Sequence, residues 1–167
     1  ARLAALAVHA PLTLVQIFDY TLRSPEIRQG TIAGGLAASP NAGVLAANGY
    51  IANHAGLASA RCIGNIGYLP DIDGVLRHTP VQTRFEEKDY PHLASALLDC
   101  AGRNERKAIS AKPPVSTSLT NENGLWRVPF RRSLSAYNVI PAIAILHESA
   151  PHSLIRNRYV LVGSSSL

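Results

Sequence analysis

The sequence predicts an α/β fold: a single domain with a mixed, mostly parallel sheet, an antiparallel hairpin and helices packed on both faces. A chain of 167 residues is close to the size of one compact domain. Hydrophobic residues make up 47% of the chain and charged residues 16%, a balance typical of a globular protein. Within residues 12–50, a strand-like run, a helix-like segment and a second strand-like run follow one another, which is the pattern of a βαβ unit.

The first elements in chain order form this predicted unit. Residues 2–9 are rich in Ala and Leu at helical spacing, and the continuous apolar run 12–18 predicts a buried strand. Ser-Pro-Glu at residues 24–26 has the pattern of a helix start, so we expect a helix from there to about Ala38. A second buried strand within residues 43–50 should lie parallel to the first.

Residues 62–85 indicate a change to antiparallel pairing. Two strand-like stretches, 63–69 and 75–85, flank the turn-forming segment 70–74, and this arrangement is typical of a β-hairpin. The remaining expected elements are a helix from Pro91 to Gly102, an exposed polar insertion over 103–124, a short strand over 125–130, a helix within 139–146 and a final buried strand over 159–162.

Charge and cysteine content narrow the classes of partner. The net charge is +5, but the basic residues are scattered, so we predict no nucleic-acid surface.

Cys62 and Cys100 lack metal-ligand spacing, which argues against a zinc site. They could form a disulfide, worth about 4 kcal/mol and suited to an oxidising compartment. Two separate buried thiols are the favoured alternative, because the sequence does not place the two residues together.

No catalytic motif is found along the chain. It contains no Gly-x-Ser-x-Gly, Cys-Gly-x-Cys or Ser-x-x-Lys pattern, and its six histidines are dispersed without metal-ligand spacing. Gly64-Asn65-Ile66-Gly67 matches neither the dinucleotide fingerprint nor the phosphate loop, which needs a lysine. We therefore predict no catalytic residue, no cofactor and no metal, and expect that this domain is not an enzyme.

Two places remain as candidate ligand positions. Asp71-Ile72-Asp73-Gly74 begins like a calcium loop, but the further oxygen ligands are missing, so an ordinary turn is favoured. Asp19 follows a predicted parallel strand, and residues 163–166 follow the last one, where open α/β sheets bind ligands. The simpler interpretations are a turn acid for Asp19 and a cut end for residues 163–166.

Several segments, in order, resemble a known family, the CHASE domain of type 2, which is a sensory extracellular domain associated with cyclases and histidine kinases. Asp19 matches an aspartate that ends the family's early strand, and residues 103–124 have no clear counterpart. The other similar segments are 67–80 with the central Asp-Gly-hydrophobic turn and its arginine, 91–97 with the next helix, 128–130 with a strand, and 159–163 with the closing strand.

This resemblance implies an extracytoplasmic sensor on the periplasmic side of the bacterial inner membrane. It further implies membrane helices before and after the domain, an unidentified small-molecule or environmental signal, a homodimer, and a cytosolic diguanylate cyclase, adenylate cyclase or kinase as output. The abrupt ends of the chain are typical of an excised fragment, and no window approaches the roughly eighteen apolar residues of a membrane span.

The resemblance brings over no catalytic residues. Asp19, Asp71, Asp73 and Arg77 are carried over only as motif positions, and Arg77 is expected to pair with Asp71 or Asp73 and fix the hairpin rather than to contact a ligand. Two other functions remain open: a ligand-independent structural or dimerisation module of a membrane protein, and a truncated soluble α/β enzyme.

Overall fold

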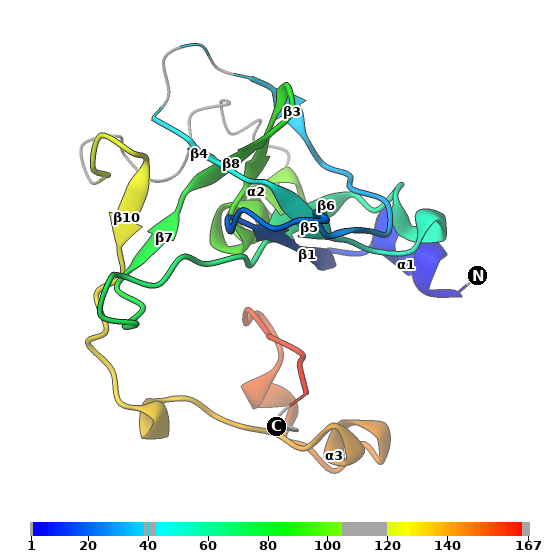
Figure 1. Ribbon diagram of the computed structural model, residues 1–167. Helices are drawn as coiled ribbons and strands as arrows, with labels where there is room; N and C mark the ends of the chain where they lie inside the picture. Colours follow the sequence, from blue (N-terminus) through cyan, green and yellow to red (C-terminus); the bar gives the residue numbers. More distant parts are fainter. Residues whose placement is uncertain (1, 39, 41–42, 105–119, 165–167) are drawn as a thin grey trace. The chain divides into compact units, whose positions relative to one another are not determined.

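The computed structural model describes residues 2–38, 40, 43–104 and 120–164. The chain divides into two compact units, Ala1–Val128 and Pro129–Leu167, and each is described by itself. Figure 1 shows their helices and strands.

The first unit contains most of the regular structure and all of the described strands. In chain order its elements are α1 (Arg2–His9), β1 (Thr13–Asp19), β2 (Arg28–Gln29), β3 (Leu36–Ala37), β4 (Leu45–Ala46), β5 (Gly49–Ile51), the 3₁₀ helix η1 (Ala55–Leu57), β6 (Cys62–Asn65), β7 (His78–Pro80), β8 (Gln82–Phe85), β9 (Lys88–Pro91), α2 (Leu93–Asn104) and β10 (Leu125–Arg127). The described strands form three sheets, ordered β2-β5-β1-β6, β3-β9-β8-β4 and β10-β7.

The sheets are mixed, as the predicted α/β class requires. Three described strand pairs are parallel, β1 with β6, β2 with β5 and β4 with β8, and four are antiparallel. The α/β class is therefore confirmed, while parallel pairing has a smaller share than the sequence predicts. One of the four antiparallel pairs, β8 with β9, is a hairpin of consecutive strands, and the other three join strands distant in sequence, whose pairing local patterns do not specify.

β1 confirms the strand predicted over residues 12–18, but the prediction that this strand is buried on both faces is wrong. Its side chains alternate between the two faces of the sheet, so Gln16 and Phe18 are buried while Val15 and Ile17 are exposed. The Phe18 ring packs against the rings of Phe85 and Tyr90, with centroids 5.8 and 4.8 Å away. These three aromatic residues form the core cluster that joins the first sheet to the second.

The helix predicted for residues 24–38 is wrong. This segment contains the short strands β2 and β3 instead. Gly30 and Gly34 have φ angles of +79° and +78°, which do not occur within an α-helix. The start signal at residues 24–26 is thus overridden by two glycines that turn the chain back towards the sheets.

The parallel neighbour predicted for the first strand is also wrong. Residues 43–50 divide between β4, which pairs with β8, and β5, which lies antiparallel to β1. The parallel neighbour of β1 is β6, with Thr13 opposite Cys62 and Gln16 opposite Asn65. The division occurs at Asn48, whose backbone amide donates to the Asp19 carbonyl and whose side chain donates to the Tyr20 carbonyl.

The predicted hairpin is only half right. Its turn is present, because the Asp71 amide donates to the Val75 carbonyl at 3.0 Å and Gly74 has a φ of +79°. The flanking strands β6 and β7 do not pair, since β6 pairs with β1 and β7 with β10. The antiparallel hairpin is formed by β8 and β9, with Arg84 opposite Asp89.

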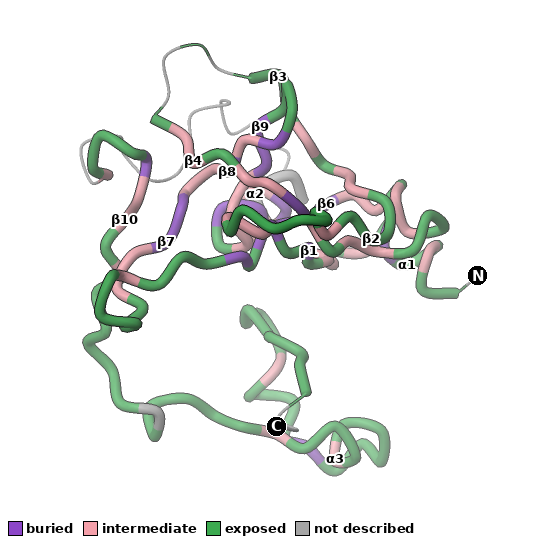
Figure 2. Tube along the Cα trace, in the orientation of Figure 1, coloured by how far each residue is buried: buried purple, intermediate pink, exposed green. Residues whose placement is uncertain are grey.

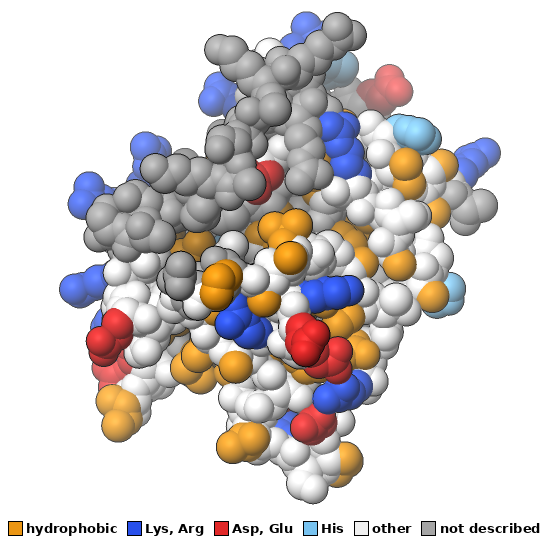
Figure 3. Space-filling view, turned by 90° about the horizontal axis from the view of Figure 1, so that it is seen from above, with side chains coloured by type: hydrophobic (Ala, Val, Ile, Leu, Met, Phe, Trp, Pro, Cys, Tyr) orange, Lys and Arg blue, Asp and Glu red, His pale blue; other side chains and the backbone are white. Residues whose placement is uncertain are grey.

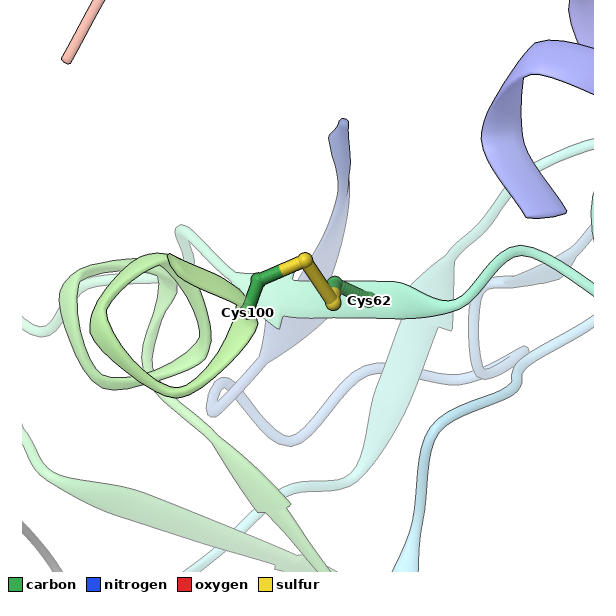
Figure 4. The surroundings of a disulfide bond; sticks show 2 residues. All are labelled: Cys62 and Cys100. Atoms are coloured by element: carbon green, nitrogen blue, oxygen red, sulfur yellow. A yellow bond between two sulfur atoms is a disulfide. The ribbon is translucent and has the colours of Figure 1, made fainter. Parts of the chain in front are cut away.

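Helix α2 lies against β6, as Figure 4 shows, and confirms the helix predicted from Pro91 to Gly102. A Cβ atom added to Gly64 of β6 would lie 2.5 Å from the Leu93 Cα atom, so the glycine permits this close approach. Cys100 of α2 forms a disulfide with Cys62 of β6. The favoured prediction of two separate thiols is wrong, because β6 and α2 bring residues 38 positions apart into contact.

The other predictions for the first unit fall on its two ends. The helix expected over residues 2–9 is α1, and the strand expected over 125–130 is the shorter β10. The insertion predicted over 103–124 lies mostly in residues 105–119, outside the described residues.

The second unit has little buried surface. It contains the 3₁₀ helices η3 (Leu134–Ala136) and η4 (His152–Leu154) and the short helix α3 (Ala142–Leu146), which confirms the helix expected within 139–146. Among its residues with described burial only Ala150 is buried, and Figure 2 shows this unit almost entirely as exposed.

The closing strand predicted over residues 159–162 is wrong. These residues belong to no strand, and all four are exposed, with Val162 92% exposed. The run has the β-branched and apolar composition of a strand, but composition alone does not supply a neighbouring strand to pair with.

Candidate functional site

The turn between β6 and β7 brings three of the four predicted site residues together. Arg77 pairs with both aspartates: its Nη1 atom lies 3.2 Å from Asp71 Oδ2, and its Nη2 atom lies 2.8 Å from Asp73 Oδ2. Asp71 also contacts His78, with 3.0 Å between its Oδ1 atom and the His78 Nδ1 atom. The predicted pairing of Arg77 with Asp71 or Asp73 is confirmed, and it involves both.

These contacts favour the charged form of both carboxylates. The hydrogen bond with His78, together with Arg77, lowers the pKa of Asp71. The hydrogen bonds from Arg77 and from the Val75 amide lower the pKa of Asp73. The stabilisation is therefore complete above the ordinary aspartate pKa and is lost as the pH falls through the lowered values. Because all the partners are partly exposed, solvent screening keeps this contribution small.

The turn holds its apolar tip away from the protein. Ile72 lies between the two paired aspartates and its side chain is fully exposed. Gly74 adopts the left-handed conformation that the turn needs, and a Cβ atom there would meet nothing within 4 Å. The motif residues thus fix the shape of the turn, and the charges of Arg77 and the aspartates are directed at one another.

Asp19, the fourth predicted residue, makes its contacts within its own segment. Its carboxylate accepts a hydrogen bond from the Thr21 amide at 3.0 Å and pairs with Arg23 at 2.7 Å. The Thr21 hydrogen bond is the main cause that lowers the pKa of Asp19, and Arg23 adds to it. This geometry is that of a turn acid, the simpler of the two interpretations. Of the other candidate segment, 163–166, Ser165 and Ser166 lie outside the described residues.

A buried polar residue that sequence reasoning missed lies at the centre of the first unit. Asn65 is 0% exposed, and its side-chain oxygen accepts hydrogen bonds from the Phe18 amide at 3.1 Å and the Gly67 amide at 2.6 Å. Its side-chain nitrogen donates to Tyr20 Oη and Thr83 Oγ1, both at 2.8 Å. Asn65 therefore links β1, β6 and β8 through bonds that satisfy its whole amide.

The sequence contains a signal for this residue, because Asn65 ends an otherwise apolar and small strand. Gly64-Asn65-Ile66-Gly67 matches neither the dinucleotide fingerprint nor the phosphate loop. Gly67 is needed for a different reason: a Cβ atom there would lie 2.4 Å from the Phe18 carbonyl oxygen. The pattern therefore marks close packing around a buried amide.

Metal-ligating side chains do not cluster within the described residues. No group of three or more His, Cys, Asp or Glu side chains in this part of the chain could hold a metal ion. On the face shown in Figure 3, Lys and Arg side chains are spread among acidic and hydrophobic ones. Among the described residues, no helix is long and apolar enough to cross a membrane.

Within this α/β domain, the charged side chains of the candidate turn are paired with one another. The family model of the CHASE2 domain matches residues 6–167, and the chain therefore belongs to the CHASE2 family. CHASE2 domains are sensory extracellular domains, so this domain has a sensory and not a catalytic role. No curated protein and no solved structure is significantly similar to the chain.

Proposed function

We propose that residues 1–167 form one sensor domain, the extracytoplasmic input of a bacterial transmembrane receptor. Its output is a cytosolic diguanylate cyclase, adenylate cyclase or protein kinase. The observation that carries the proposal is the family match over residues 6–167, which spans both compact units. The proposal includes a homodimer on the periplasmic side of the inner membrane, anchored by flanking helices.

The disulfide supports this location. Cys62 and Cys100 are both buried and joined, and disulfides of this kind persist in oxidising compartments such as the periplasm. In the reducing cytosol the same pair would be kept as thiols. The covalent link between β6 and α2 is thus in keeping with an exported domain.

Signal transmission requires two arrangements of the domain that a signal binds unequally. The Asp71–Arg77 turn is a place where such a change would cost little, because its ion pairs are partly exposed and screened by solvent. The Asn65 contacts would resist change, because breaking them leaves buried polar groups without partners. We therefore propose that the turn, and not the buried amide, adjusts to the signal.

The location is tested with fusions to the intact receptor. Alkaline phosphatase, which folds only outside the cytoplasm, is joined directly after Leu167, and β-galactosidase is joined at the same point in a second strain. The same two reporters placed after the output domain are the matched control. High phosphatase activity after Leu167 and low activity after the output domain are expected, and the reverse pattern would overturn the proposal.

The sensory role is tested on the output itself. The receptor with and without residues 6–167 is compared for cyclase or kinase activity in membranes exposed to fractionated growth medium. The intact receptor should change its activity with the medium and the deleted one should not. An output that responds equally without the domain would favour a structural or dimerisation module instead.

A further inference from the structure

A histidine forms the N-cap of helix α2. The His92 Nδ1 atom accepts a hydrogen bond from the Ala94 amide at 3.3 Å, and the His92 carbonyl accepts one from the Ala96 amide at 3.0 Å. The backbone amide of His92 donates to the Val81 carbonyl at 2.9 Å, which attaches the start of the helix to the sheet. These are the bonds of a capping residue, a position that serine, threonine, aspartate or asparagine usually occupies.

This cap works only with a neutral imidazole. A nitrogen that accepts a hydrogen bond cannot carry a proton, so the ring proton must lie on Nε2. The first turn of α2 also presents the positive end of the helix dipole, which disfavours a cation at this position. Burial adds to both effects and lowers the pKa of His92 below its ordinary value of 6.5.

Among the described residues, no charged side chain forms an ion pair or hydrogen bond with the His92 ring. The charged residues of the elements next to His92 are Arg84 on β8, Lys88 and Asp89 on β9, and Asp99 and Arg103 on α2. Arg84 and Asp89 form an ion pair with each other at 2.8 Å. Burial of the imidazole is the main cause that lowers the pKa of His92. β6 contacts His92 at Asn65, which is uncharged.

The two ends of α2 are held in different ways. Near its end, Cys100 is bound covalently to β6, and this bond does not depend on a proton in the acidic range. At its start, Leu93 lies against Gly64, and the His92 side chain caps the first turn. Protonation of His92 therefore removes this cap and favours fraying of the first turn, while the disulfide retains the other end of the helix.

We propose that His92 makes the first turn of α2 respond to acidification, so that protons are a signal that this domain reads. The proposal rests on the sensory role proposed above and names its stimulus. The sign follows from the geometry: the unfolded chain takes up the proton at a higher pH than the folded chain. The stability is thus complete above the ordinary histidine value of 6.5 and falls as the pH decreases towards the lowered value.

The test measures hydrogen exchange of the Leu93–Ala96 amides in the 167-residue chain, corrected for intrinsic rates, at about pH 7.5 and about pH 5.5. In the wild type, protection should fall about fivefold at the lower pH, which is the loss expected when an N-cap is removed. In His92→Asn, the amide oxygen caps the helix without titrating, so protection should be equal at both values. An equal loss in His92→Asn and in the wild type would overturn the proposal.

His54 supplies the matched control. Its Nδ1 atom accepts a hydrogen bond from the Gly56 amide at 3.0 Å, but it lies exposed at the short helix η1. His54→Asn should keep the full wild-type response of the Leu93–Ala96 amides. A response that disappears in His54→Asn and stays in His92→Asn would assign the effect to the wrong histidine and overturn the proposal.

A second measurement needs no variant and covers the case in which His92→Asn does not fold. Nitrogen NMR of the wild-type imidazoles should show His92 neutral with its proton on Nε2, and titrating below 6.5. Titration at or above that value would overturn the proposal. Both measurements use the isolated chain. If the first turn of α2 in this chain does not respond to pH while the intact receptor still controls its output, the proton signal is refuted and the sensory role stays intact.

Discussion

The two compact units of this chain are held together in opposite ways. In Ala1–Val128, a disulfide, an aromatic core and the hydrogen bonds of Asn65 join residues far apart in sequence. In Pro129–Leu167, the described backbone hydrogen bonds connect residues no more than six positions apart, and most apolar side chains are exposed. The stability of the first unit therefore depends on a few interactions between residues far apart in sequence. Substitutions at single residues can remove each of these interactions.

The largest expected effect is on the disulfide. Replacing both cysteines, as in Cys62→Ala with Cys100→Ala, should lower the free energy of unfolding by about 4 kcal/mol, because the open chain regains the entropy of a loop of this length. Urea denaturation of the two proteins measures the difference. Reductant should destabilise the wild type and leave the double variant unchanged, whereas a wild type insensitive to full reduction would contradict the importance of this link.

The buried amide comes next. Asn65→Ala removes four hydrogen bonds and leaves Tyr20 and Thr83 with fewer buried partners, so a loss of about 3 kcal/mol is expected. Asn53→Ala is the matched control, since that half-buried side chain donates one bond, to the Val15 carbonyl. Its cost should stay below about 1 kcal/mol. Equal midpoints in urea for the two variants would refute the central position of Asn65.

A smaller loss is expected where α2 meets β6. Gly64→Ala places a methyl group 2.5 Å from the Leu93 Cα atom and should cost about 2 kcal/mol, because the helix must shift away from the strand. Gly163→Ala introduces the same methyl group in the second unit, where nothing lies within 4 Å. Thermal denaturation should separate the two variants, and a stable Gly64→Ala protein would show that α2 has room to move.

The smallest effect is expected in the second unit. Val162→Ser changes a side chain that is 92% exposed, so the free energy of unfolding should change by less than about 0.5 kcal/mol. The comparison between the two units depends on this small effect as much as on the large losses of stability expected in the first unit. A loss of the size seen for Gly64→Ala would mean that residues 159–162 are buried in solution, as their composition first suggested.

The elements that the sequence predicted correctly are those with a strong local pattern. The apolar run before Asp19 and the Leu- and Ala-rich segment after Pro91 became β1 and α2. Prediction failed where pairing between distant residues decides, as when β6 replaced β5 as the parallel neighbour of β1. The glycines at 30 and 34 also turned a segment that began like a helix.

The candidate site, too, was predictable only where its residues lie close together in the sequence. The ion pairs of Arg77 with Asp71 and Asp73 could be inferred because all three residues lie within one turn. The environment of Asn65 could not, since its partners Tyr20 and Thr83 come from two other segments. The disulfide escaped prediction for the same physical reason, because a spacing of 38 residues fixes no distance.

The link between Cys62 and Cys100 has one more consequence. It closes a covalent ring that contains the Asp71–Arg77 turn and the strands β7, β8 and β9. A protease that cuts once after Arg77, in this exposed turn, would therefore release no fragment. The nicked domain would keep its mass on a gel until reductant is added. Without the disulfide, the same cut would separate the chain into two fragments.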